Sequence, residues 1–71
     1  MKVTTQQTEK ILKSSQSFSQ LGFSMLVTRL KSSYTKNPSP VTVQDCTTQI
    51  NAFLGKFNAI MGADYATIAK L

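Results

Sequence analysis

The strongest constraint on the fold is a pair of prolines near the middle of the chain, Pro38 and Pro40, the only two in the sequence. A proline disfavours the helical conformation of the residue before it, so a helix arriving from the N-terminal side should end by Lys36. No internal repeat or glycine-rich linker interrupts the chain elsewhere. The sequence therefore predicts helical segments on both sides of a turn over residues 36–41.

The segment before the turn carries the signals of one long helix. Thr4, followed three residues later by Gln7, can form a capping box at its start. Ser and Gln are frequent in the rest of the segment, but they weaken a helix without breaking it. We therefore predict a first helix over about residues 5–35.

The segment after the turn has large apolar residues at steps of three and four, as an amphipathic helix does. They are Val43, Cys46, Ile50, Phe53, Leu54, Phe57, Ile60 and Met61. Thr42 and Asp45 can form a capping box at the start, and Ser39 as the cap with Pro40 as the first helical residue is a nearly equivalent choice. We predict a second helix over about residues 42–61 and a short third helix over about residues 64–71, which Asp64 could cap.

No segment alternates between apolar and polar residues as a strand would, so the predicted fold class is all-α. The chain should form one domain over residues 1–71. Its second and third helices are expected to run back along the first, as an antiparallel helical hairpin with a short third C-terminal helix. A 71-residue chain with one Cys and no His has neither an internal disulfide nor an obvious metal site to support a small core. We therefore expect oligomerisation or a partner to complete it.

Both long helices are predicted to present a second uncharged face. On a helical wheel, three residues of the first helix widen the apolar arc beyond what one hairpin partner could cover. On the second helix, small residues recur at steps of four and three and would let another helix approach closely. The predicted interface comprises Phe23, Val27, Tyr34, Thr48, Ala52, Gly55, Ala59 and Gly62. Simple solvent exposure of the small residues is the alternative.

Cationic residues are the other candidate binding residues. Arg29 falls inside the apolar arc, where it could reach along the surface to Asp45 or meet a carboxylate of a partner. The net charge of +5 belongs entirely to residues 1–36, which contain six basic residues and one acidic residue, Glu9. The possible anion-binding strip comprises Lys10, Lys13, Lys31 and Lys36. A solvated helix face is the alternative explanation of these lysines.

Residues suited to catalysis are scarce. The chain has no His and only three carboxylates, and Cys46 lies on an apolar face. Neither acid–base catalysis nor a Cys–His nucleophile can be assembled from this set. The three glycines are isolated, so no phosphate-binding glycine motif occurs. We predict that the protein is not an enzyme and holds no cofactor or metal.

The sequence predicts a cytoplasmic protein without a transmembrane segment. No apolar run follows Lys2, and the longest charge-free run, residues 14–28, is too short and too polar to span a membrane. Export by a route that needs no cleavable signal stays open.

The turn Asn37-Pro38-Ser39-Pro40, between two Ser- and Gln-rich segments, resembles the Asn-Pro turn of the needle subunits of type III secretion systems. Gln49 to Phe53 is similar to the polar and aromatic pattern that follows the turn in that family. The resemblance implies a hairpin subunit of a filament. The chain departs from the family in its short segment after the turn, its positive charge and its lack of a C-terminal Lys-Asp pattern.

The leading functional hypothesis is a non-enzymatic helical protein that acts through helix–helix packing. It would be either a self-associating subunit or a small adaptor, inhibitor or immunity-type protein. One alternative is a basic accessory protein that binds nucleic acid or an anionic surface, and another is a needle-like filament subunit. A single Arg and no helix-turn-helix spacing argue against sequence-specific DNA binding.

Overall fold

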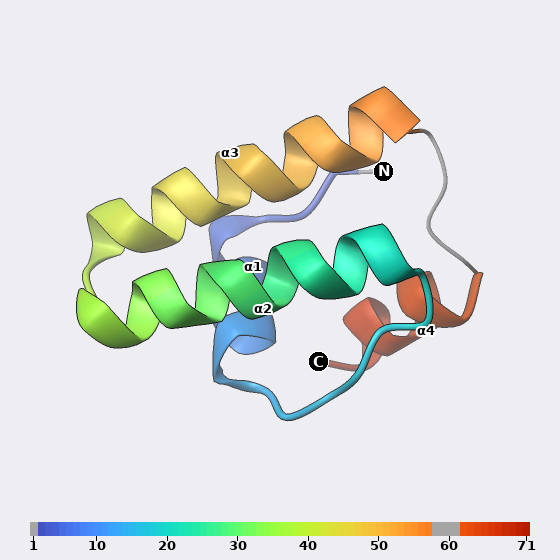
Figure 1. Ribbon diagram of the computed structural model, residues 1–71, viewed down its shortest axis with the longest axis horizontal. Helices are drawn as coiled ribbons and strands as arrows, with labels where there is room; N and C mark the ends of the chain where they lie inside the picture. The colour runs from blue at the N-terminus through green and yellow to red at the C-terminus, as the bar shows by residue number, and fades with distance from the viewer. Residues whose placement is uncertain (1, 58–61) are drawn as a thin grey trace.

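The computed structural model describes residues 2–57 and 62–71 of the chain. These residues form four helices and no strand (Figure 1). The helices are α1 (Thr5–Lys13), α2 (Leu21–Lys36), α3 (Pro40–Phe57) and α4 (Gly62–Lys70). For this part of the chain the prediction of an all-α fold is confirmed.

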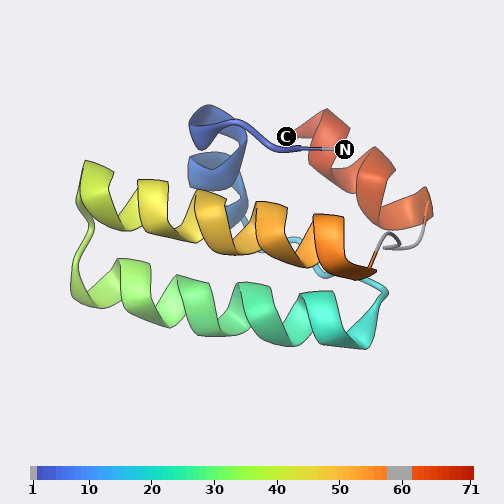
Figure 2. The same cartoon turned by 90° about the horizontal axis from the view of Figure 1, so that it is seen from above.

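The helices are arranged in two layers. α2 and α3 lie side by side and run antiparallel, with residues 37–39 between them (Figure 1). α1 and α4 both lie on one side of this pair, and α1 crosses it (Figure 2). The opposite side of α2 and α3 carries no further helix of the described chain.

The single helix expected over residues 5–35 is wrong, because the chain leaves the helical conformation between Lys13 and Leu21. Ser14, which ends α1, and Gln20, which precedes α2, both have extended backbones. An unbroken helix would be ~45 Å long and would leave its N-terminal third without a packing partner. The break lets α1 fold across α2 and α3. The molecule is therefore a two-layer bundle rather than one extended hairpin.

The other helix ends also differ from the prediction. α3 begins at Pro40, where the fixed φ of proline suits the first helical position, and the Ser39 hydroxyl accepts a hydrogen bond from the N–H of Thr42 at 3.3 Å. Of the two starts that the sequence allows, the structure therefore has the Ser39 cap with Pro40 as the first helical residue, two residues before the expected boundary at residue 42. α4 begins at Gly62 rather than 64. The expected end of the second helix at residue 61 lies outside the described residues.

The core lies between the two layers. It is built from the apolar side chains that α1, α2 and α3 turn toward one another, together with one residue each from the N-terminal segment, the α1–α2 segment and α4. These are Val3, Ile11, Leu12, Phe18, Phe23, Val27, Leu30, Val43, Cys46, Ile50, Leu54 and Ile68.

Polar contacts tie the N-terminal segment and α1 to α3. The predicted Thr4–Gln7 capping box is present at the start of α1. The buried hydroxyls of Thr8 and Thr47 lie 2.7 Å apart. The Asn51 carboxamide accepts from the N–H of Val3 at 2.7 Å and donates to its carbonyl at 3.1 Å. Because buried polar groups are stable only when paired, these contacts favour one placement of α1 over others.

A buried carboxylate links α4 to the start of α2. Asp64 is 1% exposed, and its two oxygens accept hydrogen bonds from the backbone N–H groups of Ser19 at 2.6 Å and Gln20 at 3.0 Å. Hydrogen bonds to an ionised acceptor are stronger than neutral ones. Asp64 therefore holds the α1–α2 segment instead of capping α4, the role predicted for it.

Replacing Asp64 with Ala should lower the free energy of unfolding by about 2 kcal/mol, because two backbone N–H groups lose their charged and buried acceptor. Asp64→Asn, which keeps one carbonyl oxygen, should lose less. Asp45→Ala is the matched control, since Asp45 is exposed and should change stability by less than about 0.5 kcal/mol. Urea denaturation measures all three. Equal losses for Asp64→Ala and Asp45→Ala would contradict the assigned role.

Candidate interaction surface

Part of the predicted interface lies inside the core of the chain itself. Phe23 is 0% and Val27 2% exposed, and the partly buried Tyr34 packs against the core. The Phe18 ring packs edge-on against Phe23 at a centroid distance of 4.9 Å, and the Phe53 ring lies 5.6 Å away. The expectation that another molecule covers Phe23 and Val27 is therefore wrong, because the chain covers them once α1 and α2 separate.

The small residues of α3 point into solvent. Thr48, Ala52 and Gly55 are exposed, and a Cβ atom added to Gly55 would meet no atom within 4 Å. Gly62 is also exposed, but it belongs to α4 and not to the same helix. Ala59 lies outside the described residues. The exposed part of the predicted small face is thus limited to α3, and its role as an interface stays a prediction.

Replacing Gly55 with Ala should raise the free energy of unfolding by about 0.5–1 kcal/mol, the usual advantage of Ala over Gly inside a helix. Gly22→Ala is the control, because its Cβ would lie 3.3 Å from Gln20 Oε1 and 3.4 Å from Phe53 Cζ. That crowding should offset most of the gain. Thermal unfolding monitored by circular dichroism tests both variants. A loss of stability in Gly55→Ala would indicate that another molecule covers this face in solution.

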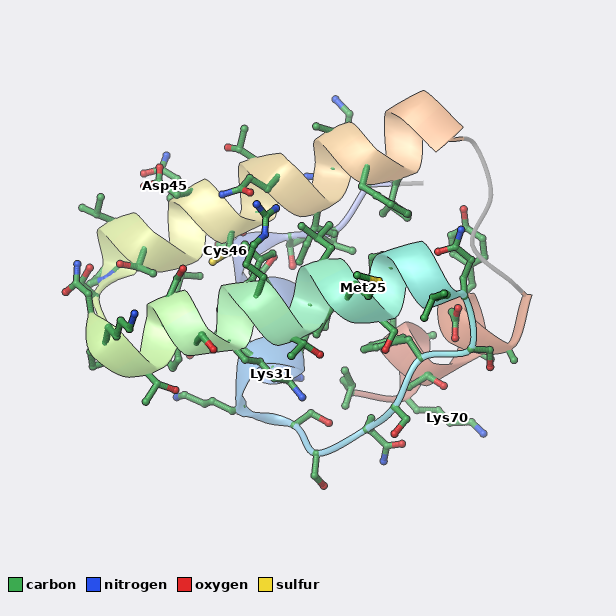
Figure 3. All side chains as sticks on the ribbon, in the orientation of Figure 1. Met25, Lys31, Asp45, Cys46 and Lys70 are labelled. Carbon is green, nitrogen blue, oxygen red and sulfur yellow. The ribbon has the colours of Figure 1, made fainter. Side chains whose placement is uncertain are left out.

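Two large apolar side chains of α2 are unexpectedly exposed. Leu21 and Met25, one helical turn apart, are 73% and 64% exposed. Met25 projects from the side of α2 that faces away from α1 and α4 (Figures 2 and 3). We call this side of the α2–α3 pair the outer face. It comprises Leu21, Gly22, Met25, Arg29 and Lys36 of α2, and Gln49 and the edge of Phe53 of α3.

Arg29 extends across the outer face from α2 to α3. Its Nη2 donates to Oε1 of Gln49 at 3.2 Å. The expected ion pair with Asp45 does not form, although Asp45 lines a hollow between α2 and α3 together with Lys36 and Gln49 (Figure 3 labels Asp45 on α3). Among the side chains that the structure describes, the only ion pair is that of Lys13 with Glu9, at 3.5 Å. The guanidinium is thus oriented by a neutral amide and has no carboxylate partner there.

The structure gives the lysines of the possible anion-binding strip separate local contacts. Lys10 and Lys13 lie in the last turn of α1, and Lys36 ends α2. A positive charge at the C-terminal end of a helix interacts favourably with the unpaired backbone carbonyls there. Lys31 donates to the backbone carbonyl of Ser14 at 2.6 Å. Helix-end and backbone interactions thus account for these positions, and an anion-binding role stays a prediction.

The described residues offer little that could hold a cofactor or metal. No group of three or more His, Cys, Asp or Glu side chains comes together in this part of the chain. A hollow of about 330 Å³ lies between α2 and α3 and is lined by Ser33, Lys36 and Gln49 among others. No helix in the described ranges is long and apolar enough to cross a membrane.

The Cys46 thiol is shielded. It is 2% exposed, and its burial, with a smaller effect from the negative charge of Asp45, raises the pKa of the thiol above its usual range. The thiol is therefore neutral at neutral pH and a poor nucleophile.

Ellman's reagent should react with native Cys46 roughly 100-fold more slowly than with the unfolded chain, because reaction requires local opening. A chain with Cys46→Ala and Thr48→Cys, whose thiol would be exposed, should react without this delay. Fast labelling of native Cys46 would contradict its burial.

The raised pKa of Cys46 also predicts a dependence of stability on pH. Because the native state favours the protonated thiol, the contribution of the thiol to stability is complete below its pKa in the unfolded chain and is lost as pH rises through the raised native pKa. Cys46→Ala should lack this alkaline loss of stability in urea denaturation at several pH values.

No protein-family model, curated protein or solved structure matches the chain. The resemblance to needle subunits therefore rests only on the Asn37–Pro40 turn and on the pattern from Gln49 to Phe53. A functional assignment rests on the geometry of the outer face.

The sequence missed Leu21 and Met25 because the helical wheel assumed one continuous helix from residue 5 to 35. On that wheel both residues fall in the main apolar lobe, and Phe23 and Val27 fall in a second lobe. A separate helix that starts at Leu21 can rotate relative to α1, so that Phe23 and Val27 are buried while Leu21 and Met25 are exposed. The Ser-rich segment before Leu21 was the only sequence signal for the break.

Proposed function

We propose that this chain is a non-enzymatic helical protein that acts by packing its outer face against another helix. The observation that carries the proposal is the exposure of Leu21 and Met25 one turn apart, in a chain that buries most of its large apolar residues. Full burial of a Leu or Met side chain is worth about 1.5–3 kcal/mol. Adjacent exposed apolar residues with polar surroundings are typical of interaction sites.

The rest of the exposed surface of α2 and α3 also favours packing. Most of its side chains are short or uncharged, among them Thr28, Ser32, Thr48, Ala52 and Gly55. Ordering such side chains in an interface costs less conformational entropy than ordering Lys or Glu. A second helix could therefore lie on this surface at a low entropic cost.

The polar groups that chemistry would need are already engaged in structural contacts. Glu9 pairs with Lys13, Asp64 accepts two backbone N–H groups, and Cys46 is buried. A binding role is therefore better supported than catalysis. The occupant of the outer face would be a second copy of this chain, as in a self-associating or filament subunit, or another protein, as for an adaptor or inhibitor.

Two measurements test the proposal. Light scattering at about 50 µM detects a second copy bound by at least ~6 kcal/mol. A titration with a neutral amphipathic helical peptide of Ala, Leu and Gln, followed by NMR, detects docking of a different helix. We expect at least one of the two signals, with chemical-shift changes centred on α2 and α3.

The double variant Leu21→Lys, Met25→Lys should abolish that signal and leave the fold unchanged, because both side chains are already exposed. Val41→Lys is the matched control, since Val41 is 66% exposed but lies at the start of α3, near the turn. It should keep the signal. If the chain is monomeric and binds no peptide, or if the Val41 variant loses binding equally, the proposal is wrong.

A further inference from the structure

We propose that the outer face docks an acidic helix of another protein rather than a second copy of this chain. This inference rests on the proposed function and specifies the partner. It is carried by the order of the side chains along α2, by the unpaired state of Arg29 and by the charge of the whole chain.

The outer face changes character along α2. Leu21 and Met25 occupy its first half, and Arg29 and Lys36 occupy the same side of its second half. Arg29 and Lys36 are seven residues apart, which is two helical turns or ~10.5 Å. A helix lying along α2 would therefore meet apolar side chains at one end and two positive charges, two turns apart, at the other.

Arg29 is held in position for a carboxylate. The Gln49 side-chain oxygen accepts a hydrogen bond from one N–H group of the Arg29 guanidinium at 3.2 Å, and the other N–H donors remain in solvent. Because Gln49 is neutral, this contact orients the guanidinium without neutralising its charge. Neither Arg29 nor Lys36 pairs with an acidic side chain of the described residues. A partner carboxylate would supply the missing charge-assisted hydrogen bonds.

A second copy of the chain is poorly suited to supply that carboxylate. Its net charge is +5, and it has only three acidic residues. Glu9 pairs with Lys13, and Asp64 is buried against backbone N–H groups, so Asp45 is the only acid that is both exposed and uncommitted. Two copies would bring like charges together, whereas an acidic partner would be attracted.

The shape of the face favours a helix over a flat membrane surface or a nucleic acid. Gly22 lies next to the Phe53 ring, so α2 and α3 approach closely there. Nearer the turn, a hollow of about 330 Å³ lies between the same two helices, and Lys36 and Gln49 line it together with Asp45, the one carboxylate there. A row of side chains on a third helix can pack against such a helix pair.

The test uses three synthetic helical peptides of about 14 residues, or four turns, with Leu residues at one end. They differ at two positions seven residues apart, which carry Glu, Gln or Lys. Fluorescence anisotropy with the full chain measures their affinities. We expect the Glu peptide to bind about 10-fold more tightly than the Gln peptide, and the Lys peptide to bind most weakly. The difference should largely vanish in about 1 M salt, where the screening length is ~3 Å.

Arg29→Gln should remove most of the preference for the Glu peptide. Lys70→Gln is the matched control, because it removes the same charge from an exposed position on α4, away from the outer face (Figure 3). Met25→Lys should instead weaken binding of the Gln peptide, which depends on the apolar half. This split separates the charged half of the face from the apolar half.

Equal affinities for the three peptides, with chemical-shift changes on α2 and α3, would overturn this inference and leave the proposed function intact. A larger species of the chain alone, lost in Leu21→Lys, Met25→Lys, would show that a second copy is the occupant. Tighter binding to phosphatidylserine vesicles or to a DNA oligonucleotide than to the Glu peptide would also overturn it. A monomer that binds none of these probes would contradict both proposals.

Discussion

The carboxylate of Asp64 connects α4 to the segment between α1 and α2, and the arrangement of the helices depends on this contact. By accepting the N–H groups of Ser19 and Gln20, it fixes the segment that separates α1 from α2 and docks α4 beside it. The side-chain oxygen of Gln20 then accepts a hydrogen bond from the N–H of Phe23 at 2.6 Å, and this N-cap starts α2 at a defined position. These neighbouring interactions set the rotation of α2 about its own axis, because a helix that starts at one fixed residue has only one face toward the core.

The rotation of α2 decides which surface is available for binding. With Phe23, Val27 and Leu30 turned inward, the core is filled by the chain itself and needs no second molecule to cover that side. The same rotation leaves Leu21 and Met25 outside. The chain therefore builds its core by folding α1 across the α2–α3 pair. The exposed side chains on which the proposed association rests lie on the opposite side of α2 and α3.

Much of the local structure was predictable because it depends on neighbours in sequence. The Thr4–Gln7 capping box is present, and the prolines separate α2 from α3. The exposure of Thr48, Ala52 and Gly55 also followed from the spacing of the large residues of α3. Arg29 was recognised as a candidate anchor, but its contact with Gln49 was not. Contacts of that kind join residues far apart in sequence, so spacing along one helix does not reveal them.

The sequence by itself determined that the chain is helical and where its central turn lies, since helix spacing, caps and proline stereochemistry act over a few residues. Only the tertiary structure decided that residues 14–20 are not helical and which face of α2 is buried. A Ser-rich segment can be helical or extended at nearly equal free energy. The choice was made by distant groups, the Asp64 carboxylate and the core around Ile11 and Phe18, whose contacts outweigh the small local preference.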